Sequence, residues 1–338
     1  MSDSVRTPGP CAAPKEPRSV SIIIPTYNRS QSLKATLESL LNLDYPSDRL
    51  EIIVVDNCST DGTKSIVEAC QAQSKCRVRY AYEGRQGSHF ARNTGAKLAA
   101  GDVLYYTDDD MIADPGLLSS LLPVFDMFPG VACATGRILP KWDVQPPSWM
   151  LPHHLSDLLG LQRRPEMLVV SEEDVGVYSG HEAVLKDVFL RSGGFNPDIE
   201  KGETVGNNEV GLNLKIKKLG YGFAYVREAV TYHVIPSSRL TQAYLNRRMV
   251  HQGGNQSYTW YRRERPSKSR IAAKMVEQVF GMSRAALQCL PRLLLGRDSW
   301  HFHCARIHYR GSWLKCCWRL FHDRRRRQSA LKDDWLEE

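Results

Sequence analysis

The chain has 338 residues, of which 42% are hydrophobic and 24% are charged, a balance typical of a soluble globular protein with one large or two modest domains. No run of 18 apolar residues occurs, so the sequence predicts no transmembrane helix. The formal net charge of +8 is uneven: residues 262–327 hold 17 Lys and Arg against four Asp and Glu, a net +13, which leaves −5 elsewhere.

The N-terminal 18 residues are rich in proline and contain no apolar run. They are expected to be disordered, and they lack the apolar segment of a secretory signal. The nine cysteines are an odd number and include no CxxC pair, so most are expected to be free thiols in a reducing compartment. These features favour a cytoplasmic protein.

Short apolar runs alternate with helical patterns through the first 115 residues. The helical patterns follow the runs, with Ser30 or Ser32 and Ser59 or Thr60 as candidate N-caps. Pro25 is expected to end the first run. Continuous apolar strands are typical of a mostly parallel sheet covered by helices on both faces. The expected strands are 20–24, 50–57, 78–84 and 103–106, and the expected helices are about 30–43, 59–73 and 87–101.

Polar residues follow three of these strands, at 25–28, 56–57 and 108–110. In parallel sheets, ligands bind beyond the carboxyl ends of the strands, so the three segments should converge on one crevice. The three adjacent carboxylates of 108–110 would repel one another there. A divalent cation, Mg²⁺ or Mn²⁺, would neutralise them and could bridge to a diphosphate. The alternative is a loop of solvated aspartates.

The alternation ends after residue 130. Residues 139–154 are rich in proline and aromatic residues and are expected to form an irregular loop. Further short strands and helices follow, and beyond about Tyr244 the chain becomes helical, basic and aromatic. The expected organisation is a tail at 1–18, a catalytic domain at 19–255, and a basic amphipathic helical extension at 256–338.

The sequence resembles the family 2 glycosyltransferases, inverting enzymes with a GT-A fold, over roughly residues 19–255. Three motifs carry the resemblance in the family's order: SIIIPTYNR, IIVVDNCSTDGT and GSHFARNTGAKLAAGDVLYYTDDDM. The last contains an Ala-Arg-Asn-x-Gly helix followed by an Asp-x-Asp motif. The resemblance therefore implies a GT-A-type, mostly parallel twisted sheet and a nucleotide-sugar donor.

The resemblance also implies a donor site. Asp110 would hold the metal, and His233, which follows a later strand, would complete the metal shell or else be a satisfied core histidine. Asp56 would accept a hydrogen bond from uracil N–H, or instead cap the following helix. The other donor-site residues would be Pro25, Tyr27 and Asn28 around the uridine, Arg92 and Asn93 near the diphosphate or ribose, and Asp108 and Asp109 near the ribose and metal.

On the acceptor side, the family has an acidic pair on a helix, and the second acid acts as the general base. Here Asn208 replaces the first acid and Glu209 stands for the second. Glu203 is a rival base, and a solvated helix acid is the alternative for Glu209. His181 and Glu182 stand where the family has a segment lining the acceptor side.

The basic extension mixes tryptophans and arginines along helical patterns. Helices of this kind suit the surface of an anionic membrane, so residues 262–327 are expected to bind one. A helix pair packed on the catalytic domain is the alternative. Nucleic acid is not expected as a partner, because no recognised binding motif accompanies the charge.

The combined prediction is an inverting, metal-dependent transferase that moves a sugar from a nucleotide sugar, a UDP-sugar first, to a saccharide or lipid-linked acceptor. It would act in polysaccharide or glycolipid assembly, as a peripheral protein at the inner face of the membrane. Two alternatives remain open. A sugar-phosphate nucleotidyltransferase is disfavoured because PTYNRSQS lacks glycines, and a degenerate nucleotide-binding module at the membrane is favoured only by Asn208.

Overall fold

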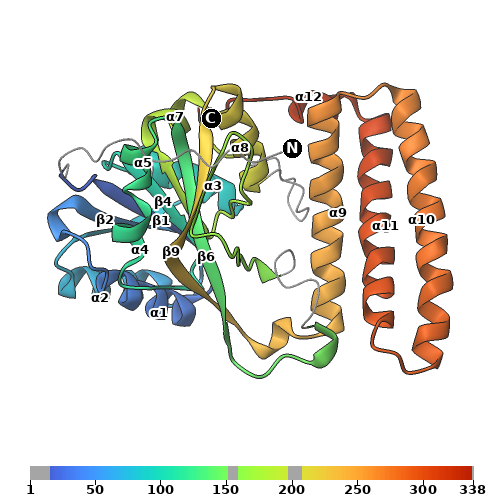
Figure 1. Cartoon of the computed structure of the whole chain (residues 1–338), viewed down its shortest axis with the longest axis horizontal. Coiled ribbons are helices and arrows are strands. Elements are labelled where there is room, and N and C mark those ends of the chain that lie inside the picture. Colours follow the sequence, from blue (N-terminus) through green and yellow to red (C-terminus); the bar gives the residue numbers. More distant parts are fainter. Residues whose placement is uncertain (1–15, 151–158, 197–207, 337–338) are drawn as a thin grey trace.

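The computed structural model describes residues 16–150, 159–196 and 208–336. It contains a nine-stranded sheet, flanked by helices, and a layer of long helices beside it (Figure 1). The first half of the sheet has the order β3-β2-β1-β4 and is parallel throughout. Its strands are β1 (Val20–Thr26), β2 (Leu50–Asp56), β3 (Arg77–Tyr82) and β4 (Val103–Thr107).

Every residue of β1, β2 and β4 is buried, which confirms the buried parallel strands predicted from their continuous apolar runs. Pro25 was expected to end β1, but it lies within the strand and stands opposite Val55 in β2. A proline forfeits only its own N–H bond, and here it lies one residue from the strand end. The ladder continues past it, because Asn57 N donates to Thr26 O at 2.9 Å.

Helices cover both faces of this sheet, as predicted. Leucines of α1 and α4 pack with Ile22 and Ile52 on one face, whereas α3, α7 and α8 pack with Ile23 and Ile53 on the other. The helices concerned are α1 (Ser30–Leu41), α2 (Thr63–Gln73), α3 (Ser88–Leu98), α4 (Leu117–Leu121), α5 (Val124–Met127), α7 (Lys186–Arg191) and α8 (Asn208–Lys218).

The predicted N-caps of the first two helices are wrong, because neither helix has a side-chain bond from its cap residue. Asp61 takes that role for both. Its carboxylate accepts from Ser30 N at 2.9 Å and from Thr63 N at 3.1 Å. The Thr63 and Ser30 bonds lower the pKa of Asp61 to about 2. One aspartate thus joins the starts of α1 and α2 beside the first two strand ends.

The second half of the sheet is mixed and continues in the order β8-β6-β9-β5, with β7 paired to β9. These strands are β5 (Met111–Ala113), β6 (Val131–Trp142), β7 (Leu168–Ser171), β8 (His181–Leu185) and β9 (Gly222–Ile235), and the short 3-10 turns are η1 (Ser47–Arg49), η2 (Ser148–Met150) and η3 (Ser237–Arg239). The loop expected from residue 139 begins later, because β6 stays paired with β9 as far as Trp142 opposite Ile235.

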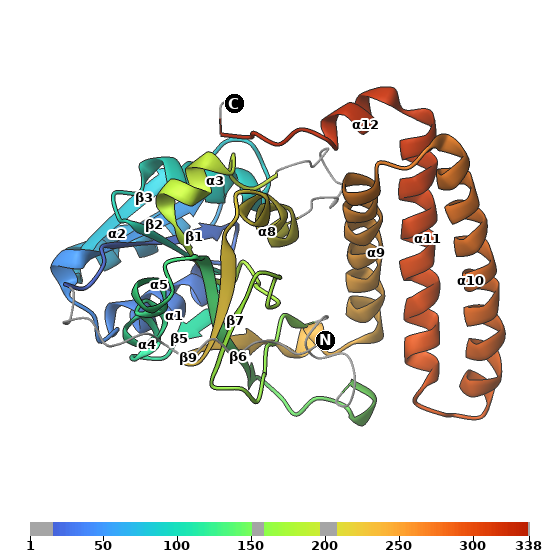
Figure 2. The same cartoon turned by 45° about the horizontal axis from the view of Figure 1, so that its top comes forward.

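The basic extension is helical, as predicted. It consists of α9 (Gln242–Glu264), α10 (Lys268–Leu294), α11 (Trp300–His322) and the short α12 (Arg324–Ser329). Both views show α11 between α9 and α10, with α10 farthest from the sheet (Figures 1 and 2). The domain boundary expected at residue 256 falls inside α9, which is continuous from Gln242. None of the helices in the described ranges is both long enough and apolar enough to cross a membrane.

Close approaches at two glycines mark the tight packing of the helix layer. A Cβ added at Gly253 would lie 2.2 Å from Tyr309 O, and one added at Gly281 would meet the Arg310 guanidinium at 2.4 Å. The end of the chain then returns to the catalytic domain, where Trp335 N donates to Gly193 O at 3.0 Å. None of the eight cysteines within the described ranges forms a disulfide.

Candidate active site

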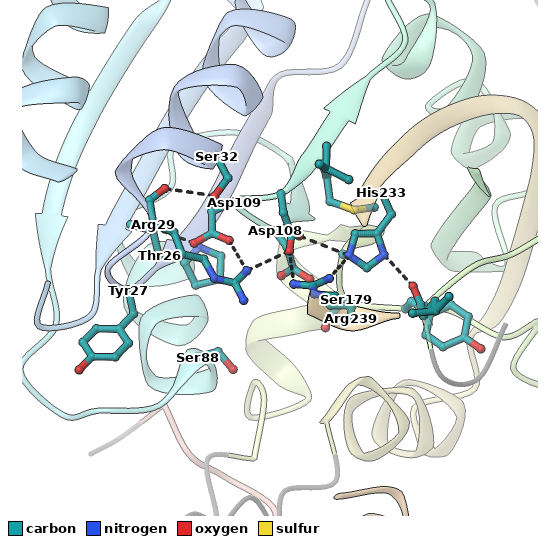
Figure 3. Close-up of a pocket in the computed structure, with 18 of the residues that line it drawn as sticks. Thr26, Tyr27, Arg29, Ser32, Ser88, Asp108, Asp109, Ser179, His233 and Arg239 are labelled. Atoms are coloured by element: carbon teal, nitrogen blue, oxygen red, sulfur yellow. Dashed lines mark hydrogen bonds and ion pairs between the residues drawn. The ribbon is translucent and has the colours of Figure 1, made fainter. Parts of the chain in front are cut away.

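A cavity of about 980 Å³ lies between the carboxyl ends of the parallel strands and the start of α9 (Figure 3). All three polar segments that follow β1, β2 and β4 contribute to its wall, as the strand arrangement predicted. Eight of the predicted site residues line it: Pro25, Tyr27, Arg92, Asp108, Asp109, Asp110, Glu209 and His233.

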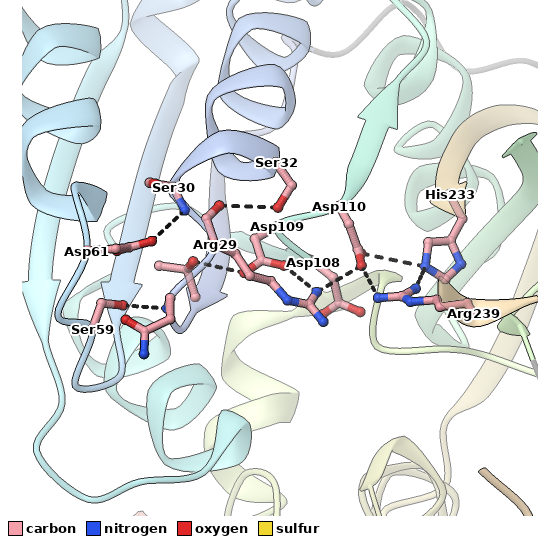
Figure 4. Close-up of polar contacts among 12 residues, drawn as sticks. Arg29, Ser30, Ser32, Ser59, Asp61, Asp108, Asp109, Asp110, His233 and Arg239 are labelled. Atoms are coloured by element: carbon pink, nitrogen blue, oxygen red, sulfur yellow. Dashed lines mark hydrogen bonds and ion pairs between the residues drawn. The ribbon is translucent and has the colours of Figure 1, made fainter. Parts of the chain in front are cut away.

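The three adjacent carboxylates point in different directions, and each meets a different set of partners (Figure 4). Asp108 accepts from Arg92 Nη2 at 2.6 Å. Asp109 is buried and accepts from Thr26 Oγ1 at 2.8 Å and from Arg29 Nη1 at 2.9 Å. Since positive side chains face each of them, the carboxylates escape the repulsion that their adjacency would otherwise cause.

Asp110 lies at the centre of the charged network. Its Oδ2 accepts from Arg29 Nη1 at 2.9 Å and from Arg239 Nη2 at 2.6 Å, and its Oδ1 lies 3.6 Å from His233 Nε2. Burial alone would raise the pKa of Asp110, but the positive charge around it, from His233 in its protonated form and from the guanidinium groups of Arg239 and Arg29, outweighs burial and lowers that pKa below the usual range. Asp110 is therefore ionised.

At the neighbouring Asp109, the effect of burial on the pKa outweighs that of the positive partner. Burial raises its pKa to about 6, against the lowering effect of Arg29. The two adjacent aspartates thus differ in the ease with which they take up a proton. Asp110 is the one suited to hold a cation.

His233 has the orientation of a metal-binding imidazole. Its Nδ1 lies 2.6 Å from the carbonyl oxygen of Leu159, and since a carbonyl can only accept, Nδ1 carries the proton. The lone pair of Nε2 then faces Asp110 and accepts from Arg239 Nη1 at 2.6 Å. A backbone carbonyl behind the second ring nitrogen is the usual arrangement for a histidine ligand.

Asp110 and His233 therefore fit a divalent cation such as Mg²⁺ or Mn²⁺. No group of three or more His, Cys, Asp or Glu in ligand geometry occurs within the described residues. Two protein ligands are enough for these ions, which keep several waters or phosphate oxygens. Arg239 bonds to both candidate ligands, so its guanidinium takes the position that a metal would need.

Two of the predicted uridine-binding residues brace the wall of the cavity from outside. Asn28 has a positive φ of 51°, and its Oδ1 accepts from Thr60 N at 2.8 Å. Asp56 accepts from Ser59 N at 2.8 Å and from Tyr80 Oη at 2.8 Å. Both side chains have local partners, so they fix the loops that present Pro25 and Tyr27 to the cavity.

The two residues of α3 that were predicted near the donor point in different directions, Arg92 to the cavity and Asn93 to the core. Arg92 lines the cavity although it is 5% exposed, and its Nε has no hydrogen-bond partner within the residues described. Asn93 points the other way and is bonded in both directions to the backbone of Phe195, at 2.9 Å each. Asn93 thus secures the Gly-Gly-Phe turn and does not line the cavity, where it had been expected near the donor.

Glu209 lies in the first turn of α8 and lines the cavity, half-buried. Burial raises its pKa, and Arg92 opposes that effect. A carboxylate with a raised pKa that faces a cavity is suited to accept a proton. The rival base Glu203 lies outside the described residues.

His181 and Glu182 are placed differently from the expectation. Both are completely buried in β8, beneath the cavity, and neither lines it. His181 contacts Tyr105 Oη at 2.9 Å and Ala229 O at 3.2 Å, and burial lowers its pKa to about 4. Successive residues of β8 face opposite sides of the sheet, and both sides are covered here, so both side chains are buried, which no single-sequence pattern had indicated.

Glu182 should make stability depend on pH. Burial and the nearby Glu209 raise its pKa from 4.5 to about 8, so between these values the unfolded state binds fewer protons than the native state. Its contribution to stability is therefore complete below about pH 4.5 and is lost as pH rises through 8. We expect Glu182→Gln to raise the free energy of unfolding at pH 8 by about 1–3 kcal/mol relative to the unmodified chain, with little difference at pH 5.

Urea denaturation at both pH values measures this effect, and Glu228→Gln, at an exposed glutamate, is the matched control. An unchanged pH dependence in Glu182→Gln would show that Glu182 is ionised in the native protein.

Several residues of the cavity were not identified from the sequence. Arg29 ends the PTYNR motif, so its position next to the first strand end offered a signal. Arg239, Arg247, Arg248 and His251 come from η3 and α9, about 130 residues after the aspartates, and line the cavity too. Only tertiary structure brings these residues to the carboxylates. The arginines among them, together with Arg29 and Arg92, make the cavity suitable for a polyanion.

Comparison with known proteins identifies the family. Residues 21–190, half of the chain, match the model of glycosyl transferase family 2, and the chain belongs to this family. The fold is of the GT-A type, as the resemblance implied.

Among characterised relatives, the glycosyltransferase AglE of Haloferax volcanii is 36% identical over 91 residues, 27% of this chain and 30% of that protein. The glucosyl-dolichyl phosphate glucuronosyltransferase of the same organism is 28% identical over 184 residues, 52% of this chain and 56% of that protein. The chain thus matches roughly a third to a half of the length of these relatives.

Solved structures support the fold over a longer stretch. The mannosyltransferase PcManGT from Pyrobaculum calidifontis, in complex with GDP-Man and Mn²⁺, superposes with a TM-score of 0.63 at 18% identity, over 93% of this chain and 91% of that one. GalNAc-T7 with UDP, GalNAc and Mn²⁺ gives a TM-score of 0.50 at 18% identity, over 74% and 51% of the two chains. At such low identity the likeness shows the fold.

Proposed function

We propose that this protein is an inverting, metal-dependent glycosyltransferase. It would move a sugar from a nucleotide sugar, a UDP-sugar first, to a hydroxyl of a saccharide or lipid-linked acceptor in polysaccharide or glycolipid assembly. The observation that carries the proposal is that one cavity is lined by a carboxylate–imidazole pair, Asp110 and His233, and by the separate carboxylate of Glu209. The carboxylate–imidazole pair suits a metal ion with a bound diphosphate. The separate carboxylate suits the acceptance of a proton.

In this proposal Asp110 and His233 hold Mg²⁺ or Mn²⁺, with Asp108 and Asp109 beside them. The ion, when bound, stabilises the negative charge that develops on the departing diphosphate. Arg29 and Arg239 neutralise Asp110 in its absence, and they lie close enough to bind phosphate oxygens when a donor is present. Pro25 and Tyr27 line the donor side of the cavity, and the loops braced by Asn28 and Asp56 hold them there.

Glu209 is the proposed general base. Its carboxylate takes the proton of the acceptor hydroxyl while that oxygen forms a bond to the anomeric carbon on the side opposite the nucleotide. The bond from the anomeric carbon to the diphosphate oxygen breaks, and its electron pair leaves with the nucleoside diphosphate. Attack from the opposite side inverts the configuration at that carbon. Arg92 bonds to Asp108 and holds its positive charge near Glu209, where it favours the ionised form of the base.

The alternatives explain fewer observations. A nucleotidyltransferase does not account for the family match over residues 21–190. A degenerate binding module would not need Glu209 at the cavity with a raised pKa. Both alternatives predict no sugar transfer.

Ligand-dependent thermal stability tests the proposal most directly. Ligands that bind only the native state raise the melting temperature with occupancy. We expect UDP or a UDP-sugar to raise it by several degrees in Mn²⁺ and by much less without the ion. GDP and GDP-sugars, measured in parallel, decide the nucleotide. Absence of a shift with every nucleotide, with or without Mn²⁺, would reject the proposed donor class.

A further inference from the structure

Helix α10 presents an outer apolar face that no other described residue covers. Its side chains are strongly exposed, with Phe280 at 72%, Leu287 at 76% and Leu294 at 76%. We call the outer apolar face the set Val276, Val279, Phe280, Leu287, Leu290, Leu293, Leu294 and Leu295. Exposed apolar side chains gathered on one helix, in place of scattered ones, mark an interaction surface.

The spacing of these residues is that of a second face on the helix. Residues 276, 280, 287, 290 and 294 recur every three, four or seven positions, which places them on one side. A different stripe, Ile271, Gln278 and Ala285, is buried in the helix layer. Since that inner stripe already packs α10 against α11, the outer apolar face is not needed to hold the fold.

The charge around the outer apolar face decides whether a second copy of this chain or a lipid surface would cover it. Residues 268–297 contain six Lys and Arg and one acid, Glu277. Arg284, exposed, lies within the face, and Lys268, Arg270 and Arg297 are exposed near its ends. A second copy of this chain packed on the same face would bring like charges together. An anionic lipid surface offers the opposite charge and an apolar layer beneath it.

Most of α11, the most aromatic helix of the extension, is not available for such a contact, although Trp318 is 57% exposed. In α11, Trp313, Cys316, Cys317 and Leu320 are buried between α9 and α10. The membrane-binding segment expected at residues 262–327 is therefore narrowed mainly to α10.

From this geometry we infer that α10 lies flat in the headgroup region of an anionic bilayer, with the outer apolar face in contact with the acyl chains. The bilayer is the surface that carries the lipid-linked acceptor, and this last step rests on the proposed function. The contact itself depends only on α10.

Vesicle sedimentation of the full chain tests the inference. The probes are vesicles of phosphatidylcholine alone and vesicles that also contain phosphatidylglycerol. We expect binding to the anionic vesicles, weakened by salt, and a loss of about tenfold or more in the triple variant Leu287→Gln/Leu290→Gln/Leu294→Gln. The matched control changes three exposed apolar residues elsewhere, Met127→Gln/Leu190→Gln/Leu219→Gln, and should bind as the unmodified chain does.

Two results would overturn the inference. One is equal vesicle binding by the triple variant and the unmodified chain, or no binding by either. The other is a dimer, seen by light scattering, that the triple variant turns into a monomer while vesicles bind neither form, which would make a second copy the occupant. Melting temperature and the UDP–Mn²⁺ shift should be the same in the triple variant, so a failure of donor binding remains distinct from a failure of membrane binding.

Discussion

The variant Asp110→Asn is expected to lose the Mn²⁺-dependent part of nucleotide binding and to lower kcat/KM by about a thousandfold or more. The amide keeps the shape of the side chain but removes the negative charge that would hold the ion between itself and His233. It also leaves Arg29 and Arg239 with one counter-charge fewer, so the variant melts at a lower temperature. The relevant quantity is the shift caused by UDP and Mn²⁺ over its own ligand-free melting temperature.

Two further variants make this test specific. Asp187→Asn removes a carboxylate from an exposed pair with Arg191 and should leave the shift unchanged. Arg239→Ala should act in the opposite direction on the ion alone, because the guanidinium competes for Asp110 and His233. Free Mn²⁺ measured by electron paramagnetic resonance should then reveal tighter binding without nucleotide. Retention of the full Mn²⁺-dependent shift in Asp110→Asn would place the metal elsewhere.

The variant Glu209→Gln is expected to lower kcat by about 10²–10⁴-fold while the UDP–Mn²⁺ shift stays as in the unmodified chain. The glutamine cannot accept the proton of the acceptor hydroxyl, but it leaves the donor side of the cavity intact. Because burial raises the pKa of Glu209, the rate of the unmodified protein should increase with pH as this carboxyl loses its proton. That increase should be absent in the variant.

Steady-state transfer across pH with a saturating donor measures both effects. A variant that keeps the full kcat and the same pH profile would exclude Glu209 as the base. Glu173→Gln, at an exposed acid that pairs with Lys217, serves as the control and should change neither.

Much of the site followed from the chain order of strands and polar turns. Pro25, Asp56 and Asp110 each lie at or just beyond the carboxyl end of a buried strand, and parallel strands bring such ends together whatever the rest of the fold does. The direction of side chains could not be read in the same way. Asn28 accepts from Thr60 in the next loop, and Asp56 accepts from Ser59 and Tyr80. His181 and Glu182 face opposite sides of β8 and are both buried because both sides of the sheet are covered.

The cations of the site were harder to predict than its acids. Arg239 reaches Asp110 across 129 residues, and no local pattern marks a residue that acts through such a contact. The sequence of the extension likewise predicted its helices but not how the helices pack. Its composition indicated helices and a basic surface, but only the packing of α11 between α9 and α10 revealed which helix is left uncovered.

The order of the three long helices also sets the distance between the cavity and a bilayer that contacts α10. Packed helices lie about 8–10 Å apart between axes, so α9 stands about 16–20 Å from α10, with α11 between them. The cavity uses the other side of α9, through Tyr244, Arg247 and His251. With α10 on a bilayer, the reaction would take place about two helix diameters above the lipid. Such a stand-off favours acceptors whose growing end is carried away from the headgroup by a stalk of sugars, and it disfavours a first sugar added directly at the membrane surface.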